Sequence, residues 1–213
     1  MNRLVLILLL FSSSLFSQVK IAQLKYNGGG DWYANPSALK NLINFTNKNI
    51  SANILSPYDI VDINSDNLYS YPFIHMTGHG NVVFTDAQIS RLRTYLENGG
   101  FLHIDDNYGM HKYILREIKR IFPDKDLRLL PKSHPIFHQT FDFNNGLPKI
   151  HEHDGLTPQA FAITENNRVI LLYTHESDIS DGWEDAKVHN DPESLRLQAL
   201  KMGSNIIEYA FTN

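Results

Sequence analysis

Four short groups of polar residues in this sequence combine side chains that suit acid–base or metal chemistry. At 78–80 a histidine stands between two glycines, whose backbone can approach a ligand closely. At 105–107 two adjacent carboxylates are followed by an amide. The third group is His134, just after a third strand, and the fourth is the segment 175–183, which follows the hairpin. Imidazole and carboxylate groups are what general acid–base catalysis and metal-assisted hydrolysis require. The candidate ligand-binding residues are Gly78, His79, Gly80, Asp105, Asp106, Asn107, His134, Asp178 and Trp183.

Each group also has a purely structural explanation. The glycine turn is equally compatible with a solvated histidine. Asp105 and Asp106 leave a strand on opposite faces, so one is expected to enter a shared site. The other caps the following helix, with Asp106 or Asn107 accepting its amide protons. His134 precedes a proline, which favours extended backbone and suits a turn histidine as well.

Other histidines and a tryptophan leave similar alternatives open. His151 and His153 would project to one face of a strand, but they stand in a loop bounded by glycine and proline, which disfavours a zinc site. His75 and His103 lie inside apolar strands and are expected in the core or behind a site. Trp183 stands in an acidic loop that suits a lid, a sugar-stacking platform or a turn with a packed tryptophan.

The elements that position these groups alternate between strand and helix. An apolar strand at 73–77 ends at the glycine turn, and the strand at 101–104 ends at the two aspartates. A capping box of Thr85 and Gln88 opens the helix between them. This order predicts a mainly parallel sheet, whose ligands bind beyond the carboxyl ends of the strands. Further predictions are strands at 19–26, near 51–55 and at 127–130, a helix opened by Asn35-Pro36, a hairpin of 159–164 and 168–174 around Asn166-Asn167, and a closing helix after Asp191-Pro192.

Composition excludes several classes of protein. A net charge of −4, with scattered basic residues, gives no footprint for nucleic acid. The chain has no cysteine, which excludes disulfides, a thiolate nucleophile and cysteine-ligated metals. Nucleophile-elbow, zincin, phosphate-loop and dinucleotide-binding motifs are missing as well. No cofactor is expected, and a divalent metal is the one exception that these side chains would accommodate.

The first 17 residues have the order of a cleavable signal peptide: one basic residue, an apolar run and small residues. The apolar run is less than half of the roughly 20 residues that a membrane-spanning helix needs. We expect cleavage after Ser17, a single α/β domain at 18–213, and no membrane span in the mature chain. The protein is expected to be exported, and hence periplasmic or secreted.

Taken together and in order, the motifs resemble one known family. They are the Gly-His-Gly turn, the segment 92–102, the aspartate pair with Asn107, the segments 134–137 and 178–184, and the segment 202–206. Over nearly the whole mature sequence the chain resembles the domain of unknown function 4159 family. That family resembles the class I glutamine amidotransferase-like proteins, which implies a flavodoxin-like, mainly parallel sheet flanked by helices. Those enzymes use a cysteine, so its absence here excludes glutaminase activity.

Two functions follow as hypotheses. The favoured one is a non-catalytic domain that binds a cell-envelope ligand, such as a carbohydrate, or a partner protein. The alternative is a hydrolase of the cell envelope, metal-assisted or not, built from His79, Asp105 or Asp106, His134 and Asp178. Convergence of these side chains on one cleft would indicate a site, and wide separation would exclude the hydrolase.

Overall fold

The protein is built around one seven-stranded sheet. The structure, a computed structural model, describes residues 18–50 and 52–213. Five neighbouring strands, in the order β2-β1-β3-β4-β7, run parallel, and β6 and β5 complete one edge antiparallel to their neighbours. The predicted signal peptide lies outside the described residues. The strands are β1 (Ala22–Lys25), β2 (Asp59–Asp62), β3 (Phe73–Gly78), β4 (Phe101–Asp106), β5 (Arg128–Leu129), β6 (Gln159–Glu165) and β7 (Arg168–His175).

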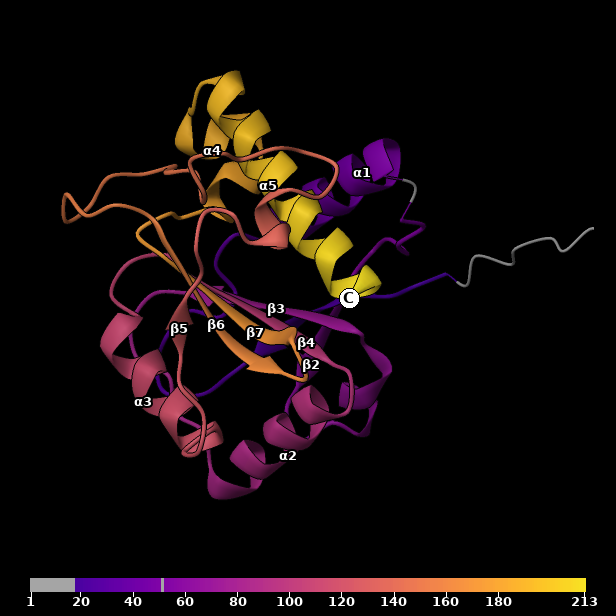
Figure 1. Ribbon diagram of the computed structural model, residues 1–213, viewed down its shortest axis with the longest axis vertical. Coiled ribbons are helices and arrows are strands. Elements are labelled where there is room, and N and C mark those ends of the chain that lie inside the picture. Colours follow the sequence, from indigo (N-terminus) through magenta and orange to yellow (C-terminus); the bar gives the residue numbers. More distant parts are fainter. Residues whose placement is uncertain (1–17, 51) are drawn as a thin grey trace, which may run out of the picture.

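Helices cover both faces of the sheet, as Figure 1 shows, with α2 and α3 on one side and α1 and α5 on the other. This arrangement follows from the parallel connections, each of which must cross over a face of the sheet to return to its starting edge. The mixed α/β class predicted from the sequence is confirmed. The helices are α1 (Ala38–Ile50), α2 (Asp86–Glu97), α3 (His111–Ile121), α4 (Ala186–His189) and α5 (Glu193–Thr212), with short 3₁₀ helices η1 (Asp66–Ser70), η2 (Pro135–Phe137) and η3 (Asp181–Trp183).

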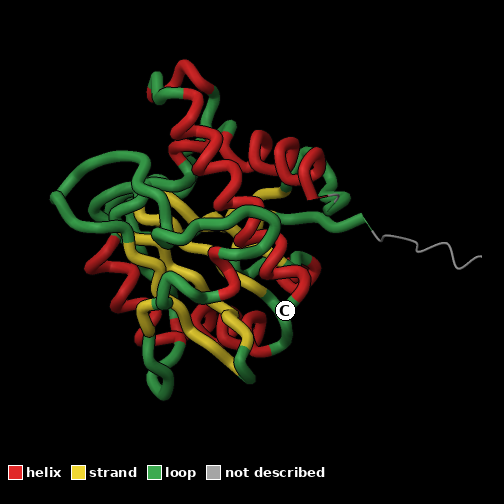
Figure 2. The backbone as a smooth tube through the Cα atoms, turned by 45° about the horizontal axis from the view of Figure 1, so that its top comes forward, coloured by secondary structure: helices red, strands yellow, loops and turns green. Residues whose placement is uncertain are grey.

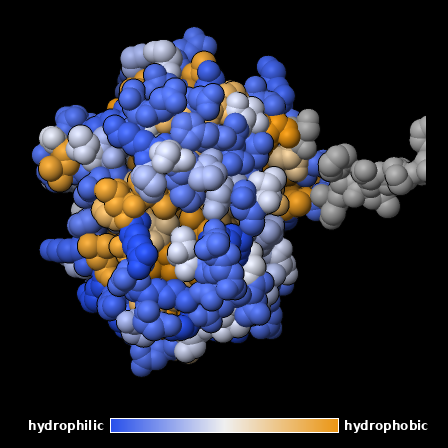
Figure 3. Space-filling model, viewed as in Figure 1, coloured by the Kyte–Doolittle hydropathy of each residue, from blue (hydrophilic) through white to orange (hydrophobic). Residues whose placement is uncertain are grey.

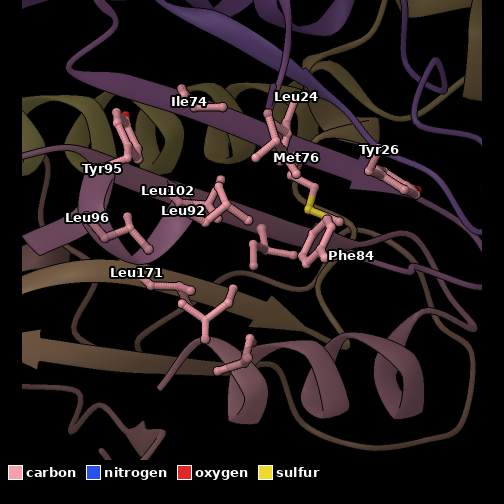
Figure 4. Close-up of a cluster of buried hydrophobic side chains, with 14 of the residues drawn as sticks. Leu24, Tyr26, Ile74, Met76, Phe84, Leu92, Tyr95, Leu96, Leu102 and Leu171 are labelled. Carbon is pink, nitrogen blue, oxygen red and sulfur yellow. The ribbon is translucent and has the colours of Figure 1, made fainter. Parts of the chain in front are cut away.

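Each face of the sheet has its own hydrophobic core. Figure 4 shows the core beneath α2 and α3, where Leu92 and Leu96 pack on Ile74 and Leu102 of the sheet. The opposite core lies under α1 and α5 and includes the fully buried Trp183. The face seen in Figure 3 is mostly hydrophilic, with apolar patches between polar side chains. Burial on both faces explains why the central strands are apolar runs without alternation.

Most predicted elements form where the sequence placed them. The capping box at α2 is present, and both residues of the predicted hairpin turn have positive φ, 49° at Asn166 and 63° at Asn167. The prediction of a strand near 51–55 is wrong. Ile54 forms only an isolated bridge with Val19, and the edge strand is β2 instead. The sequence pattern did not reveal β2, because this edge strand has a single buried residue, Val61.

The start of α1 also differs from its prediction. Asn35 does not cap the helix, because its backbone has a φ of 60° and its side chain donates to Asp181 and Ser180. A distant carboxylate caps it instead. The buried Glu184 accepts hydrogen bonds from the backbone N–H groups of Ser37 and Ala38, each at 2.9 Å. A negative charge at a helix N-terminus is favourable, so this contact ties α1 to the loop after β7.

We predict that Glu184→Ala lowers the free energy of unfolding by about 2–3 kcal/mol, because buried N–H groups lose a charged acceptor. Urea unfolding measures this difference. The exposed Glu193, in the first turn of α5, provides the matched control, and Glu193→Ala should change stability by less than about 0.5 kcal/mol. Equal effects of the two substitutions would show that the cap contributes nothing specific.

Candidate functional site

The two neighbouring aspartates of β4 point to opposite faces of the sheet, as the alternation of a strand requires. Asp105 faces α5 and accepts hydrogen bonds from Ser180, while Asp106 faces α3 and accepts one from the N–H of Met110 at 2.9 Å. Asp106 therefore both binds the start of α3 and reaches the pocket described next. Figure 2 shows long loops gathered over one end of the strands.

A pocket of about 550 Å³ opens at the carboxyl ends of β4 and β7. Asp106, His111 and His175 lie on its wall, one each from β4, α3 and β7. One ligand atom from each lies within 4.8 Å of the other two. The distance between His175 Nε2 and Asp106 Oδ2 is 4.0 Å, which is too long for a hydrogen bond. It is no longer than two zinc–ligand bonds of about 2.0–2.2 Å placed end to end, so an ion can lie between the two atoms.

Hydrogen bonds orient both imidazoles toward this point. His111 Nδ1 lies 2.8 Å from the Tyr173 hydroxyl, which in turn lies 3.2 Å from Asp106 Oδ2. Since tyrosine has one hydroxyl hydrogen, donation to Asp106 leaves its oxygen to accept from His111 Nδ1–H. His175 Nδ1 lies 3.5 Å from the Gln159 side-chain oxygen. Burial lowers the pKa of His175, and the nearby His111 ring lowers it further, so His175 is neutral at pH 7.

A second set of polar groups also lines the pocket. His153 Nε2 bonds to Asp178 Oδ2, and the His153 ring stacks on Tyr108 with centroids 4.4 Å apart. Among the described residues, the buried Oδ1 of Asp178 has no hydrogen-bond partner. Glu176 is also buried here, and its carboxylate contacts Lys149 at 3.1 Å. Carboxylates thus outnumber cations in this set.

Beneath the pocket, a buried polar row crosses three strands on the α5 face. His75 and His103 face each other with 3.1 Å between their Nδ1 atoms, and His103 Nε2 lies 3.1 Å from the Thr174 hydroxyl. Thr174 donates to Asp105 at 2.5 Å. Burial raises the pKa of the Asp105 carboxyl to about 7, and it lowers the pKa of His75 to about 3. These groups brace the end of β4 without contacting the pocket.

The Gly-His-Gly turn lies beside the pocket, and one of its glycines lines it. Gly78 has a φ of 137°, and a Cβ there would lie 2.4 Å from the Tyr26 hydroxyl, so glycine is required. Gly80 contributes to the pocket wall. The His79 ring is half exposed and pairs with Asp31 at 3.0 Å. The structure therefore places this histidine at the rim, held by an aspartate that sequence reasoning missed.

Three other candidates have structural roles. His134 caps η2, where its Nδ1 accepts from Ile136 N–H, and it packs on Tyr209 near the amino end of β7. With about 3.3 Å of rise per residue along β7, it lies roughly 20 Å from the pocket. Trp183 is fully buried and donates to the Ala199 carbonyl, so it offers no stacking surface. The Asn107 side chain points under the loop and donates to Asp181 at 2.7 Å.

Of the predicted residues, Gly80, Asp106 and Asp178 therefore meet at one pocket. Three histidines line the pocket, His111, His153 and His175. None was among the candidate ligand-binding residues, and His153 had been considered with His151 as a zinc ligand and disfavoured. His175 directly follows the strand predicted at 168–174 and is the last residue of β7, and that position at a strand end was the available signal. His111 could not be identified from the sequence, because its place beside Asp106 depends on how α3 packs in the folded chain.

The family model described as Domain of unknown function (DUF4159) matches residues 20–211, nearly the whole described chain. The chain belongs to this family. No curated protein matches it. The predicted family is thus confirmed, and the site has to be interpreted from its own geometry.

We predict that the buried histidine pair makes stability fall in acid. Native His75 and His103 have pKa values depressed by burial, whereas the unfolded value is about 6.5. Between these values only the unfolded chain takes up the protons, so stability is present above pH 6.5 and is lost as pH decreases. His75→Asn keeps a polar group near Nδ1 and removes one titration.

Urea unfolding from pH 7 to pH 5 measures the effect. The loss of unfolding free energy should be about 2 kcal/mol smaller in His75→Asn than in the wild type, at 1.36 kcal/mol per pH unit for one group. The comparison concerns the pH dependence alone, since the smaller side chain also lowers stability at every pH. Parallel curves for the two proteins would contradict a neutral, buried His75.

Proposed function

We propose that this protein binds a small, oxygen-rich ligand through a divalent cation held by Asp106, His111 and His175. The observation that carries the proposal is the convergence of these three side chains on the wall of a pocket of about 550 Å³. Two imidazoles and one carboxylate suit zinc and similar first-row cations. Three protein ligands leave a coordination position for an oxygen of the ligand.

The pocket's other groups support this chemistry. The carboxylates of Asp178 and Glu176 lie on the wall and favour a bound cation by their charge. Lys112 at the rim offers a positive charge to an anionic part of the ligand. Tyr108, which is 48% exposed, offers a ring face of the kind that sugars and similar rings stack on. A hydroxylated or carboxylated fragment of the cell envelope fits this combination.

The same groups would also support metal-assisted hydrolysis, in which the cation lowers the pKa of a bound water. Of the side chains in the sequence-based version, Asp106 and Asp178 reach the pocket and His79 stands at its rim. His134 does not take part. Glu176, whose Oε1 lies 4.0 Å from His175 Nε2, is positioned to accept a proton from such a water, and the His153–Asp178 pair lines the same pocket.

We also propose export and a wider relationship. The basic, apolar and small residues at 1–17 support cleavage after Ser17, and N-terminal sequencing of the secreted chain should read Gln18 first. None of the helices in the described part of the chain has the length and hydropathy needed to cross a bilayer. The parallel order β2-β1-β3-β4-β7 supports a flavodoxin-like, amidotransferase-like ancestry.

We predict that His175→Ala loses one bound zinc ion per chain, because it removes one of three ligands. Isothermal titration of chelator-treated protein with ZnCl₂ gives the stoichiometry and affinity. His134→Ala is the matched control, since both histidines are partly buried and only His175 lines the pocket. The control should bind as many zinc ions as the wild type.

Equal zinc binding by wild type and His175→Ala would contradict the proposed site. Incubation of the zinc-loaded wild type with chromogenic esters, phosphoesters and glycosides then separates the two functions. Release of chromophore by the wild type but not by His175→Ala indicates hydrolysis, and binding without release indicates a ligand-binding protein.

A further inference from the structure

A second cluster of cation ligands lies on the other side of the loop that follows β7. His151 comes from the loop before β6, Asp181 from η3 and His189 from the end of α4. One ligand atom of each lies within 4.8 Å of the others. Asp181 Oδ2 lies 3.0 Å from His151 Nδ1 and 3.8 Å from His189 Nε2. Asp191 lies on the other side of the His151 ring, 3.2 Å from Nε2.

The key carboxylate is held in a ligand-like orientation. Asp181 Oδ1 accepts two amide hydrogen bonds, from Asn35 and from Asn107, each at 2.7 Å. Both amides bind the same oxygen, so Oδ2 is left facing the two imidazoles. Outer hydrogen bonds that fix one oxygen of a carboxylate and present the other are characteristic of metal ligands.

The local charge also favours a cation. Three carboxylates surround His151, because Asp178 Oδ2 lies 3.6 Å from its Nδ1 in addition to Asp181 and Asp191. Their side chains are only 2%, 9% and 11% exposed, in the order Asp178, Asp181, Asp191. The unpartnered Oδ1 of Asp178 adds a buried acceptor in the described chain. As metal ligands His151 and His189 would be neutral, and the carboxylates around them would then leave a negative charge for the cation to balance.

We propose that His151, Asp181 and His189 bind a second divalent cation, of the zinc class, that has a structural role. The donors are His151 Nδ1, His189 Nε2 and Asp181 Oδ2, a nitrogen and oxygen set that zinc accepts. Asp191 accepts from His151 Nε2–H and so fixes the orientation of the ring, as carboxylates behind metal-binding histidines do. The cation would fasten α4 and the loop at 151–155 to η3. That loop also carries His153 and Asp154, which line the pocket, so the second cation would order one pocket wall.

The test counts zinc ions in four forms of the chelator-treated, full mature protein: wild type, His189→Ala, His175→Ala and a control. His189 stands at the end of a four-residue helix and is partly exposed, so its removal leaves the core intact. His138, which pairs with the single exposed Asp142, is the control for adventitious binding by a histidine–aspartate pair. Isothermal titration gives the stoichiometry, and thermal melting with and without ZnCl₂ gives the stabilisation.

The expected result is two zinc ions in the wild type and His138→Ala and one in each of the other variants. His189→Ala should weaken the second site at least about 10-fold and reduce the zinc-dependent rise in melting temperature. One zinc ion that His189→Ala abolishes and His175→Ala retains would support this site and overturn the proposed function. Zinc binding that His189→Ala leaves unchanged, or that His138→Ala reduces equally, would overturn this inference.

Discussion

The adjacent carboxylates at the end of β4 are the constraint on which the rest of the site depends. A strand sends Asp105 and Asp106 to opposite faces, and both are buried, so each needs its own partners. On one face Asp105 is satisfied by Thr174 and Ser180, which fixes the loop after β7. On the other face Asp106 is satisfied by the start of α3, which brings His111 to the pocket.

The paired aspartates also connect the pocket to the loop after β7, on the opposite face of the sheet. Ser180, held by Asp105, is followed at once by Asp181, whose carboxylate receives the amides of Asn107 and Asn35. The same loop continues to Glu184, which caps α1. A single segment thus joins the end of β4, the start of α1 and both candidate cation clusters. The carboxylates of Asp181 and Glu184 in this segment each accept several hydrogen bonds, as a rigid ligand-binding edge requires.

The sequence predicted what local chemistry determines. Alternation of strands and helices, the Thr85 capping box and the paired asparagines of the hairpin all encode their structure within a few residues. Asp106 and Asp178 were identified because they follow strands that end at one edge of the sheet. His111 and His175 were missed because 64 positions separate them in the sequence. Trp183 was misleading, since nothing local distinguishes a packed tryptophan from an exposed one.

The claim that Asp106, His111 and His175 hold a cation is tested most directly by anomalous diffraction from crystals grown with zinc. Data collected on both sides of the zinc absorption edge locate the ion without reference to the protein atoms. The account predicts an anomalous peak in the pocket, bonded to all three side chains at about 2.0–2.2 Å. Zinc bound only at other histidines, with His175 Nε2 and Asp106 Oδ2 still 4.0 Å apart, would contradict it.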